Sequence, residues 1–375
     1  MNIILFFTYG VTLQDWVKNG SLEREIKLYK KLSENKKIKF TFITFGNESD
    51  RKFQSYVGNI NILPIYEKYK FHENKLLRFI YSFYIGLKLN KKFENIDLIK
   101  TNQLMGSWLA AMLKIKSKSP LIIRTGYNVF YFSLKNKKSI SKKVIYFLLT
   151  QVGVLFSDLY FVSSNQEKDF MNKYFLFTKN KLQLRRNWID TDTSFTLAEN
   201  KLQDRILSVG RLEYQKNYEY LIKSFSKSSI TIDIVGEGSQ IEYLKKIANE
   251  NNTKCNFIEN MPHEELLKIM SQYHIFVLTS LFEGNPKALL ESMAMGCIPV
   301  VSNIKNNQEI ITDGKNGILI DVQSDKLKNI VEELLIDKKR LIEMSKYSKQ
   351  SIHESYSLEK LVEIEYQDYL NLINS

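Results

Sequence analysis

Short apolar runs alternate with helical patterns along this chain, and the alternation starts again near the middle. The first series of strand candidates reads Ile3–Phe7, Lys39–Phe45, Asn61–Pro64, Asp97–Lys100, Leu121–Arg124 and Leu159–Val162. The second series reads Arg205–Val209, Thr231–Val235, Asn256–Ile258, His274–Leu278 and Ile298–Ser302. Strands that alternate with helices predict a parallel sheet wrapped by helices. Two such series predict an α/β protein with two doubly wound, Rossmann-like domains.

The restart falls near residues 186–197 and marks the boundary between the domains. A length of 375 residues agrees with two domains, because one hydrophobic core rarely serves so long a chain. We assign residues 1–187 to the N-terminal domain and 188–357 to the C-terminal domain, followed by a helical stretch of about 358–375. No Gly/Ser/Pro-rich tether separates the domains, so we expect them to face each other across a cleft lined by the loops that follow the strands.

Composition indicates a globular protein of a reducing compartment. Hydrophobic residues make up 44% and charged residues 25% of the chain, which excludes a disordered protein. The N-terminus lacks the basic region of a secretory signal, and no apolar run approaches the roughly 18 residues of a membrane span. Cys255 and Cys297 fit no metal spacing and read as reduced thiols. We therefore expect a cytoplasmic protein, soluble or peripheral at the inner face of the membrane.

The charge is divided unevenly between the two halves. Residues 1–190 carry a net charge of +19 and residues 191–375 a net charge of −6, which together give the +13 of the chain. Basic residues mix with apolar and aromatic ones in Lys70–Phe93 and in 129–157, a pattern that suits an anionic membrane surface. The alternative is ordinary helices with solvated lysines. A basic half also attracts nucleic acid, but we recognise no nucleic-acid-binding motif and expect no such partner.

The densest motif runs from Leu281 to Gly296 and contains two glutamates, Glu283 and Glu291. It follows a strand, and Asn285 and Pro286 are typical of the N-cap and first position of a helix. The amides at such a helix end form a seat for phosphates, and Gly284 allows the backbone to approach a ligand closely. We therefore expect the two carboxylates to contact opposite ends of a nucleotide sugar, one the sugar hydroxyls and the other the ribose.

A second motif follows the strand Arg205–Val209. Gly210 forms the turn, and Arg211 and Lys216 precede the next helix. Two fixed cations can neutralise a diphosphate leaving group, which is the main electrostatic demand when a sugar–diphosphate bond is cleaved. A glycine-rich turn, Gly236-Glu237-Gly238, follows the next strand and is a weak signal by itself.

Together these residues resemble the retaining glycosyltransferases of the GT-B fold that are often called family 4. The resemblance covers nearly the whole C-terminal half, from Val209-Gly210-Arg211-Leu212 through the two glutamates to Glu309-Ile310-Ile311 and Asn316-Gly317. It implies that Arg211 and Lys216 hold the donor diphosphate, that Glu283 contacts the donor sugar and that Glu291 binds the ribose. Residues 284–287, including Lys287, are implied to lie beside the phosphates and sugar.

The N-terminal half resembles the family more loosely. Asn19-Gly20-Ser21 resembles the glycine loop near donor and acceptor, and Asn187-Trp188-Ile189-Asp190 resembles an inter-domain turn with Trp188 in place of glycine. Many members have a histidine after the strand that corresponds to Leu121–Arg124, and this chain has none there. We predict Tyr127, Asn128 and Gln103 on the acceptor side. The resemblance also implies that the last helix crosses back to the N-terminal domain.

The predicted reaction moves a sugar from a nucleoside diphosphate to an acceptor hydroxyl with retention at the anomeric carbon. Glu283, Arg211 and Lys216 are the candidate catalytic residues, and we expect neither cofactor nor metal. The sequence Asp190-Thr191-Asp192 spells a metal-binding pattern of another glycosyltransferase fold but falls at the linker. A glycan or lipid-linked acceptor of cell-surface polysaccharide, lipopolysaccharide or glycolipid assembly is expected. The alternatives are a nucleotide-sugar epimerase or phosphorylase, or a basic nucleic-acid-binding protein with a degenerate enzyme half; base, sugar and acceptor stay open.

Overall fold

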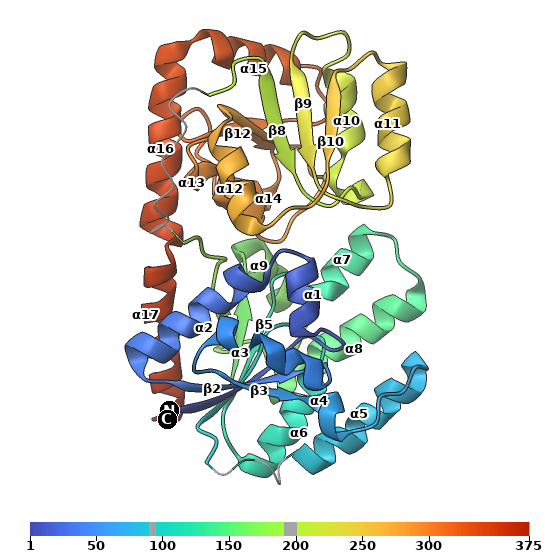
Figure 1. Cartoon of the computed structure of the whole chain (residues 1–375), viewed down its shortest axis with the longest axis vertical. Coiled ribbons are helices and arrows are strands. Elements are labelled where there is room, and N and C mark those ends of the chain that lie inside the picture. The colour runs from blue at the N-terminus through green and yellow to red at the C-terminus, as the bar shows by residue number, and fades with distance from the viewer. Residues whose placement is uncertain (90–92, 94, 191–200, 375) are drawn as a thin grey trace. The chain divides into compact units, whose positions relative to one another are not determined.

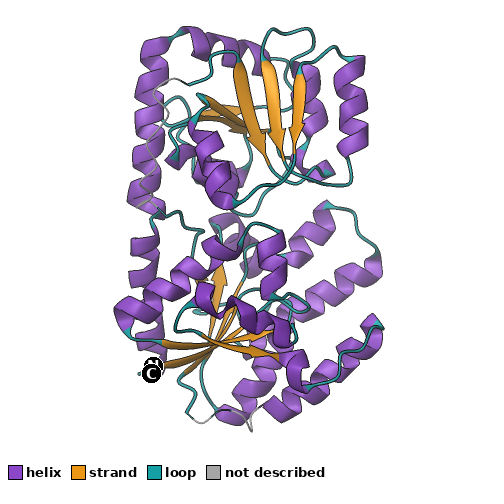
Figure 2. Ribbon diagram, viewed as in Figure 1, coloured by secondary structure: helices purple, strands orange, loops and turns teal. Residues whose placement is uncertain are grey.

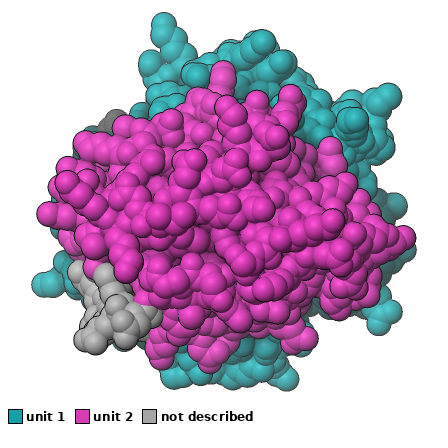
Figure 3. All heavy atoms as spheres, turned by 90° about the horizontal axis from the view of Figure 1, so that it is seen from above, with its two compact units in different colours: residues 1–185, 361–375 teal, residues 186–360 magenta. Residues whose placement is uncertain are grey.

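The structure, a computed structural model, describes residues 1–89, 93, 95–190 and 201–374. The chain divides into two compact units, which Figure 3 shows in different colours. Unit 1 comprises residues 1–185 and 361–375, and unit 2 comprises residues 186–360. These boundaries lie within a few residues of the assigned positions 187 and 358. The expected cleft between the domains stays a prediction.

Unit 1 is built on a seven-stranded parallel sheet in the order β3-β2-β1-β4-β5-β6-β7. The strands are β1 (Asn2–Phe6), β2 (Lys39–Thr44), β3 (Asn61–Pro64), β4 (Leu98–Thr101), β5 (Leu121–Arg124), β6 (Leu159–Val162) and β7 (Leu182–Leu184). Ile3 of β1 pairs with Phe40 on one side and with Leu98 on the other. The strand order reverses between β1 and β4, so loops after these two strands diverge at the carboxyl edge of the sheet.

Helices cover both faces of this sheet (Figure 2). They are α1 (Leu13–Lys18), α2 (Leu22–Lys36), α3 (Gln54–Val57), α4 (Ile65–Lys68), α5 (Lys75–Leu89), α6 (Ser107–Ser117), α7 (Val129–Lys135), α8 (Ile140–Phe156) and α9 (Asn165–Tyr174), with a 3-10 helix η1 (Glu48–Phe53). α1 follows β1 and begins with a capping box between Thr12 and Asp15. Among the described residues, none of the helices combines the length and hydropathy needed to cross a bilayer.

The C-terminal helix α17 (Leu358–Ile373) belongs to unit 1 from residue 361 onward. It is held by a buried ion pair between Lys100 of β4 and Glu365, and Tyr369 donates a 2.6 Å hydrogen bond to the same carboxylate. Burial alone would raise the pKa of Glu365, but Lys100 and Arg124 outweigh it, so the pKa is lowered. Arg185 forms a further ion pair with Asp368. These contacts agree with the helix returning to the N-terminal domain (Figure 1).

Unit 2 repeats the architecture with a six-stranded parallel sheet in the order β10-β9-β8-β11-β12-β13. The strands are β8 (Arg205–Val209), β9 (Thr231–Val235), β10 (Cys255–Ile258), β11 (Ile275–Leu278), β12 (Ile298–Ser302) and β13 (Ile318–Ile320). The helices are η3 (Tyr214–Lys216), α10 (Tyr218–Ser224), α11 (Ile241–Glu250), α12 (His263–Ser271), α13 (Lys287–Ala294), α14 (Lys305–Gln308), α15 (Leu327–Ile336) and α16 (Lys338–Tyr356).

Alternate residues of each strand enter different hydrophobic clusters, one on each face of the unit 2 sheet. Ile206 of β8 joins the cluster that contains Leu221 of α10, whereas its neighbour Leu207 joins the cluster that contains Leu289 of α13. A parallel sheet buried on both faces reads as an unbroken apolar run in the sequence, which is why most strands of both units could be predicted. β7 and β13 were missed because each is three residues long.

Candidate active site

The strand order of unit 2 reverses between β8 and β11, which are neighbours in the sheet. Both strands are parallel, so the loops that follow them start side by side at the carboxyl edge and then diverge. This reversal is where open α/β sheets bind nucleotides. The loop after β8 carries Arg211 and Lys216, and the loop after β11 carries Glu283. The two motifs found in the sequence therefore meet at one edge of one sheet.

Lys216 and Glu283 form a direct ion pair, with Nζ 2.6 Å from Oε1. Ser280 donates a second hydrogen bond of 2.6 Å to the same carboxylate oxygen. The other oxygen, Oε2, accepts no hydrogen bond from the described residues, yet it is not fully enclosed. An ionised carboxylate has several acceptor positions and an ammonium has three donors. The pair can therefore bind a ligand hydroxyl at Glu283 and a ligand anion at Lys216 without separating.

Gln215 fixes the β8 loop to the β11 loop. The side-chain amide of Gln215 donates to the Phe282 carbonyl at 2.8 Å. The backbone carbonyl of Gln215 accepts from the Leu281 N–H at 2.9 Å. Gln215 is buried, so both bonds are made away from water. Gln215 and Ser280 were not among the predicted site residues, and only their positions beside Lys216 and Glu283 could have marked them.

The start of α13 differs from the prediction. The helix begins at Lys287, Pro286 is its N-cap, and Asn285 does not cap it. The Asn285 Oδ1 atom is buried without a hydrogen-bond partner in the described part of the chain. The assignment of Asn285 as N-cap was wrong because Pro286 occupies the cap with extended backbone, at φ −72° and ψ 102°. No side chain caps α13, and the positive end of the helix dipole lies at this first turn.

Two asparagines orient the loop that leads into α13. Asn306 donates to the Gly284 carbonyl, and Asn187 donates to the Asn285 carbonyl at 2.7 Å. In a trans peptide the C=O and the following N–H point in opposite directions. Because Asn306 holds the Gly284 carbonyl, the Asn285 N–H points to the opposite side, where it meets no acceptor among the described residues.

Glu291 lies inside α13 and is 2% exposed. Its Oε1 atom is 3.0 Å from Nε2 of His263, the first residue of α12. Glu291 is a predicted ribose ligand, whereas no sequence motif marked His263. The imidazole fixes one oxygen of the carboxylate and so orients Glu291.

The glycines of the two strand-to-helix turns have a structural reason to be glycine. A Cβ on Gly236 would lie 2.1 Å from the Gly210 carbonyl oxygen, and a Cβ on Gly238 would lie 2.4 Å from the Leu212 carbonyl oxygen. Backbone bonds join the same turns, from Gly210 N to Val235 O and from Leu212 N to Glu237 O. Close packing of these turns therefore requires Gly236 and Gly238, while their predicted contact with the donor stays a prediction.

Arg211 differs from Lys216 in its surroundings. Its side chain is exposed and forms no ion pair or hydrogen bond with the described residues. Gly210 lies against Lys216 instead, since a Cβ there would be 3.0 Å from the lysine Cε. The guanidinium is thus available to bind an anion at this sheet edge.

In unit 1 the predicted acceptor-side residues follow β4 and β5. Gln103 accepts a 2.9 Å hydrogen bond from the Gly126 N–H, which joins the loops after these two strands. Tyr127 is 47% exposed and its ring lies 4.9 Å from that of Phe132. Gly20 follows α1 with φ +61°, in the segment after β1. These residues follow strands at or beside the β1–β4 reversal, as nucleotide-type sites do.

Asn128 stabilises the start of α7. Its side chain accepts from the Tyr131 N–H at 2.9 Å and so caps α7, and it is 2% exposed. The neighbouring loop is held by Glu167, which accepts from Thr125 and Ser163. Burial raises the pKa of Glu167. Tyr127 and Gln103 are therefore better placed than Asn128 to contact a ligand.

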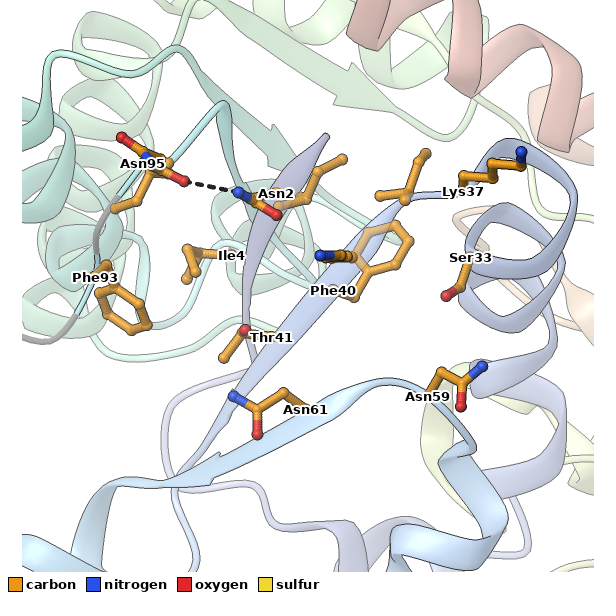
Figure 4. Close-up of a pocket in the computed structure, with 14 residues that line it drawn as sticks. Asn2, Ile4, Ser33, Lys37, Phe40, Thr41, Asn59, Asn61, Phe93 and Asn95 are labelled. Carbon is orange, nitrogen blue, oxygen red and sulfur yellow. Dashed lines mark hydrogen bonds between the residues drawn. The ribbon is translucent and has the colours of Figure 1, made fainter.

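A cavity of about 570 Å³ lies at the other edge of the unit 1 sheet. Asn2, Lys39 and Asn61, at the amino ends of β1, β2 and β3, line it (Figure 4). None of the predicted site residues lines it, and ligands of such sheets bind at the carboxyl ends. We do not assign it to the reaction.

The predicted metal alternative falls largely outside the described residues. Asp190 is described, whereas Thr191 and Asp192 are not. A reaction without metal stays a prediction.

Comparison with known proteins agrees with this geometry. Two Rossmann-like parallel sheets are the architecture of the GT-B fold. Residues 190–351 match the family described as glycosyl transferases group 1.

Two curated relatives are similar over most of the chain. One is "N-acetylgalactosamine-N,N'-diacetylbacillosaminyl-diphospho-undecaprenol 4-alpha-N-acetylgalactosaminyltransferase" of Campylobacter jejuni, 26% identical over 70% of this chain and 74% of the relative. The other is "UDP-Gal:alpha-D-GlcNAc-diphosphoundecaprenol alpha-1,3-galactosyltransferase" of Escherichia coli, 26% identical over 76% of this chain and 78% of the relative.

A solved structure shares the fold of the whole chain. The Anabaena protein HepE, crystallised with UDP and glucose, aligns with a TM-score of 0.74 at 14% identity and covers 99% of this chain and 100% of its own. The predicted GT-B fold is confirmed.

Proposed function

We propose that the protein is a retaining glycosyltransferase that moves a sugar from a nucleoside-diphosphate sugar to the hydroxyl of a lipid-linked or glycan acceptor. The observation that carries the proposal is the Lys216–Glu283 ion pair, with one carboxylate oxygen still open. The pair presents a cation for phosphate and an acceptor for a sugar hydroxyl 2.6 Å apart. A sugar joined to a diphosphate carries both a hydroxyl and an anion, so a carboxylate beside a cation matches both parts of such a donor.

The remaining donor contacts follow from the same edge of the sheet. Arg211 would bind the diphosphate bidentately, and the start of α13 would add the positive end of its dipole. Glu291, oriented by His263, would accept from the ribose hydroxyls. These groups neutralise the diphosphate without a metal ion.

Retention follows if the acceptor attacks from the face that the phosphate leaves. The bond between the anomeric carbon and the phosphate oxygen breaks, and a bond from the acceptor oxygen to that carbon forms. The acceptor proton passes to the departing phosphate oxygen, so no separate base is needed. Arg211 and Lys216 stabilise the charge that develops on that phosphate, the contribution that usually dominates such catalysis.

The acceptor class is supported by the names of the relatives. Both the Campylobacter and the Escherichia protein are named for sugars carried on diphospho-undecaprenol. We therefore propose a lipid-linked glycan acceptor, with a place in cell-surface polysaccharide, lipopolysaccharide or glycolipid assembly.

A thermal-shift screen of the full chain over nucleotide sugars tests donor binding. A ligand at 100 times its Kd stabilises the folded state by about 2.7 kcal/mol, or several degrees for a protein of this size. UDP sugars come first, because the names of the Escherichia relative and the Anabaena structure contain UDP. Donor turnover without acceptor would instead support an epimerase or phosphorylase, and no shift with any nucleotide sugar would contradict the proposal.

A further inference from the structure

The outer surfaces of α5 and α8 expose large apolar side chains in unit 1. On α5, Leu76, Ile80 and Leu87 are 67%, 57% and 54% exposed; on α8, Ile140, Val144 and Leu148 are 79%, 50% and 54% exposed. Within each helix the three residues share one face, because they are spaced by four or seven positions. We call these six residues the outer face.

The opposite side of each helix is already packed, so the outer face is not a core surface turned outward. Ser82 of α5 accepts a 2.9 Å hydrogen bond from Trp108 of α6, and Gly86 of α5 lies against Met112 of α6. Gly153 of α8 lies against Leu104 and Ile123. A helix that is apolar all round is normally buried all round. Here one half of each helix has no covering element among the described residues.

The two helices lie on the same side of unit 1. α6 contacts both α5 and α8, so α5 and α8 flank α6. Figure 1 shows α5 and α8 along one side of unit 1. The six residues therefore lie on two helices that flank the same helix, α6.

Positive charge surrounds this apolar surface. The segment 129–157 contains five lysines and no acidic residue, and α5 contains Lys75, Arg78 and Lys88 and no acidic residue. Lys142 and Lys143 lie in the first turn of α8, beside the exposed Ile140. Apolar side chains suit the acyl-chain region of an anionic bilayer, and the flanking cations suit its charged headgroups.

We propose that the outer face docks the protein onto an anionic lipid bilayer, with α5 and α8 lying in the interface. Neither helix spans the bilayer. A second copy of this chain fits the face less well. In a symmetric dimer the lysines around the face of one copy would lie opposite the same lysines of the other, and each chain carries a net charge of +13. The inference goes beyond the proposed reaction but suits a lipid-linked acceptor, which would be presented at that interface.

Vesicle co-sedimentation of the full chain tests the proposal, using phosphatidylcholine vesicles with and without 30% phosphatidylglycerol. We expect binding to the anionic vesicles that weakens as salt rises. Ile140→Glu should lower the partition coefficient by about ten-fold or more, since it removes apolar area and adds a charge. The matched control is Ile336→Glu on α15, where the isoleucine is 81% exposed and the substitution is the same. Lys142→Ala should lower it by about five-fold.

Circular dichroism establishes that each variant is folded. Equal partitioning of Ile140→Glu and Ile336→Glu, or no binding of the unaltered chain to anionic vesicles, would overturn the proposal. Sedimentation equilibrium addresses the rival: a dimer that Ile140→Glu dissociates, without vesicle binding, assigns the face to a second copy. The vesicle experiment contains neither donor nor acceptor. A negative result would therefore contradict membrane docking but not the proposed transferase reaction.

Discussion

Lys216 of η3 donates to Glu283 across 2.6 Å, and this contact joins the loops after two neighbouring strands of unit 2. Both side chains are mostly buried, at 13% and 7% exposure. Each residue therefore has a structural partner as well as a proposed ligand. Substituting either one will alter stability and donor binding together, and the two effects must be measured separately.

A double-mutant cycle separates them. Lys216→Met and Glu283→Gln should each destabilise unit 2 by about 1–3 kcal/mol, because each leaves a buried charge without its partner. The double variant should lose less than the sum, by about 1–2 kcal/mol. Urea unfolding measures these values, and additive losses would show that the pair contributes no coupling. All three variants should lose the thermal shift given by the nucleotide sugar.

Arg211→Ala should behave differently from the Lys216 variant. Its side chain is exposed and unpaired within the described residues, so its removal should change the free energy of unfolding by less than about 0.5 kcal/mol. Transfer should nevertheless fall about 10²–10³-fold, since a cation on the leaving phosphate is lost. Steady-state kinetics and urea unfolding of the same preparation give both numbers. Near-normal kcat would remove Arg211 from the site.

The packing of the turns around Gly238 predicts a steric effect on stability. Gly238→Ala should destabilise unit 2 by about 3 kcal/mol or more, because its Cβ would overlap the Leu212 carbonyl at 2.4 Å. Gly314→Ala is the control: it has φ +74° and no atom within 4 Å of the new Cβ, so only a backbone cost of about 1–2 kcal/mol is expected. Equal losses in thermal unfolding would mean that the turns move apart freely.

Stability should fall as the pH drops from about 6.5 to 4 because of His274. Burial, aided by the charge of Lys201, lowers the pKa of His274 to about 4, whereas an unfolded histidine titrates near 6.5. As the pH falls, the unfolded chain therefore binds a proton on His274 before the folded chain does. The contribution of the neutral imidazole to folding stability is complete above pH 6.5 and is lost as the pH falls toward 4. His274→Gln should remove about 1–2 kcal/mol of that loss in urea titrations at the two pH values. If the variant loses as much free energy of unfolding between the two pH values as the unaltered chain, the His274 imidazole does not cause the loss.

The sheets and the charged site residues were predictable because their signals are local. Strands such as β11 (Ile275–Leu278) are unbroken apolar runs. Arg211, Lys216 and Glu283 follow strand ends within a few residues. Contacts distant in sequence gave no such signal. The pairing of Lys100 with Glu365 joins residues 265 positions apart, and His263 and Asn306 enter the site from other elements. Those residues become recognisable only when the strand order is known.

The start of α13 shows why a local signal can mislead. Asn followed by Pro is a common helix entry, and the sequence placed Asn285 at the cap. In the structure the Asn285 carbonyl is bound by Asn187 and the helix starts one residue later. The hydrogen bond from Asn187 outweighed the local preference for an Asn cap. The Asn285 side chain is left with its Oδ1 atom buried and without a hydrogen-bond partner in the described part of the chain, at the proposed donor site.

The central claim is that unit 2 delivers a sugar from a nucleotide donor with its anomeric configuration kept. The most direct measurement is the proton NMR spectrum of the glycan made by the full chain from an α-linked nucleotide sugar and a lipid-linked acceptor, in EDTA. We predict an α-linked product, made by the unaltered chain and not by Glu283→Gln. A β-linked product would contradict retention, and an undiminished yield from Glu283→Gln would contradict the site.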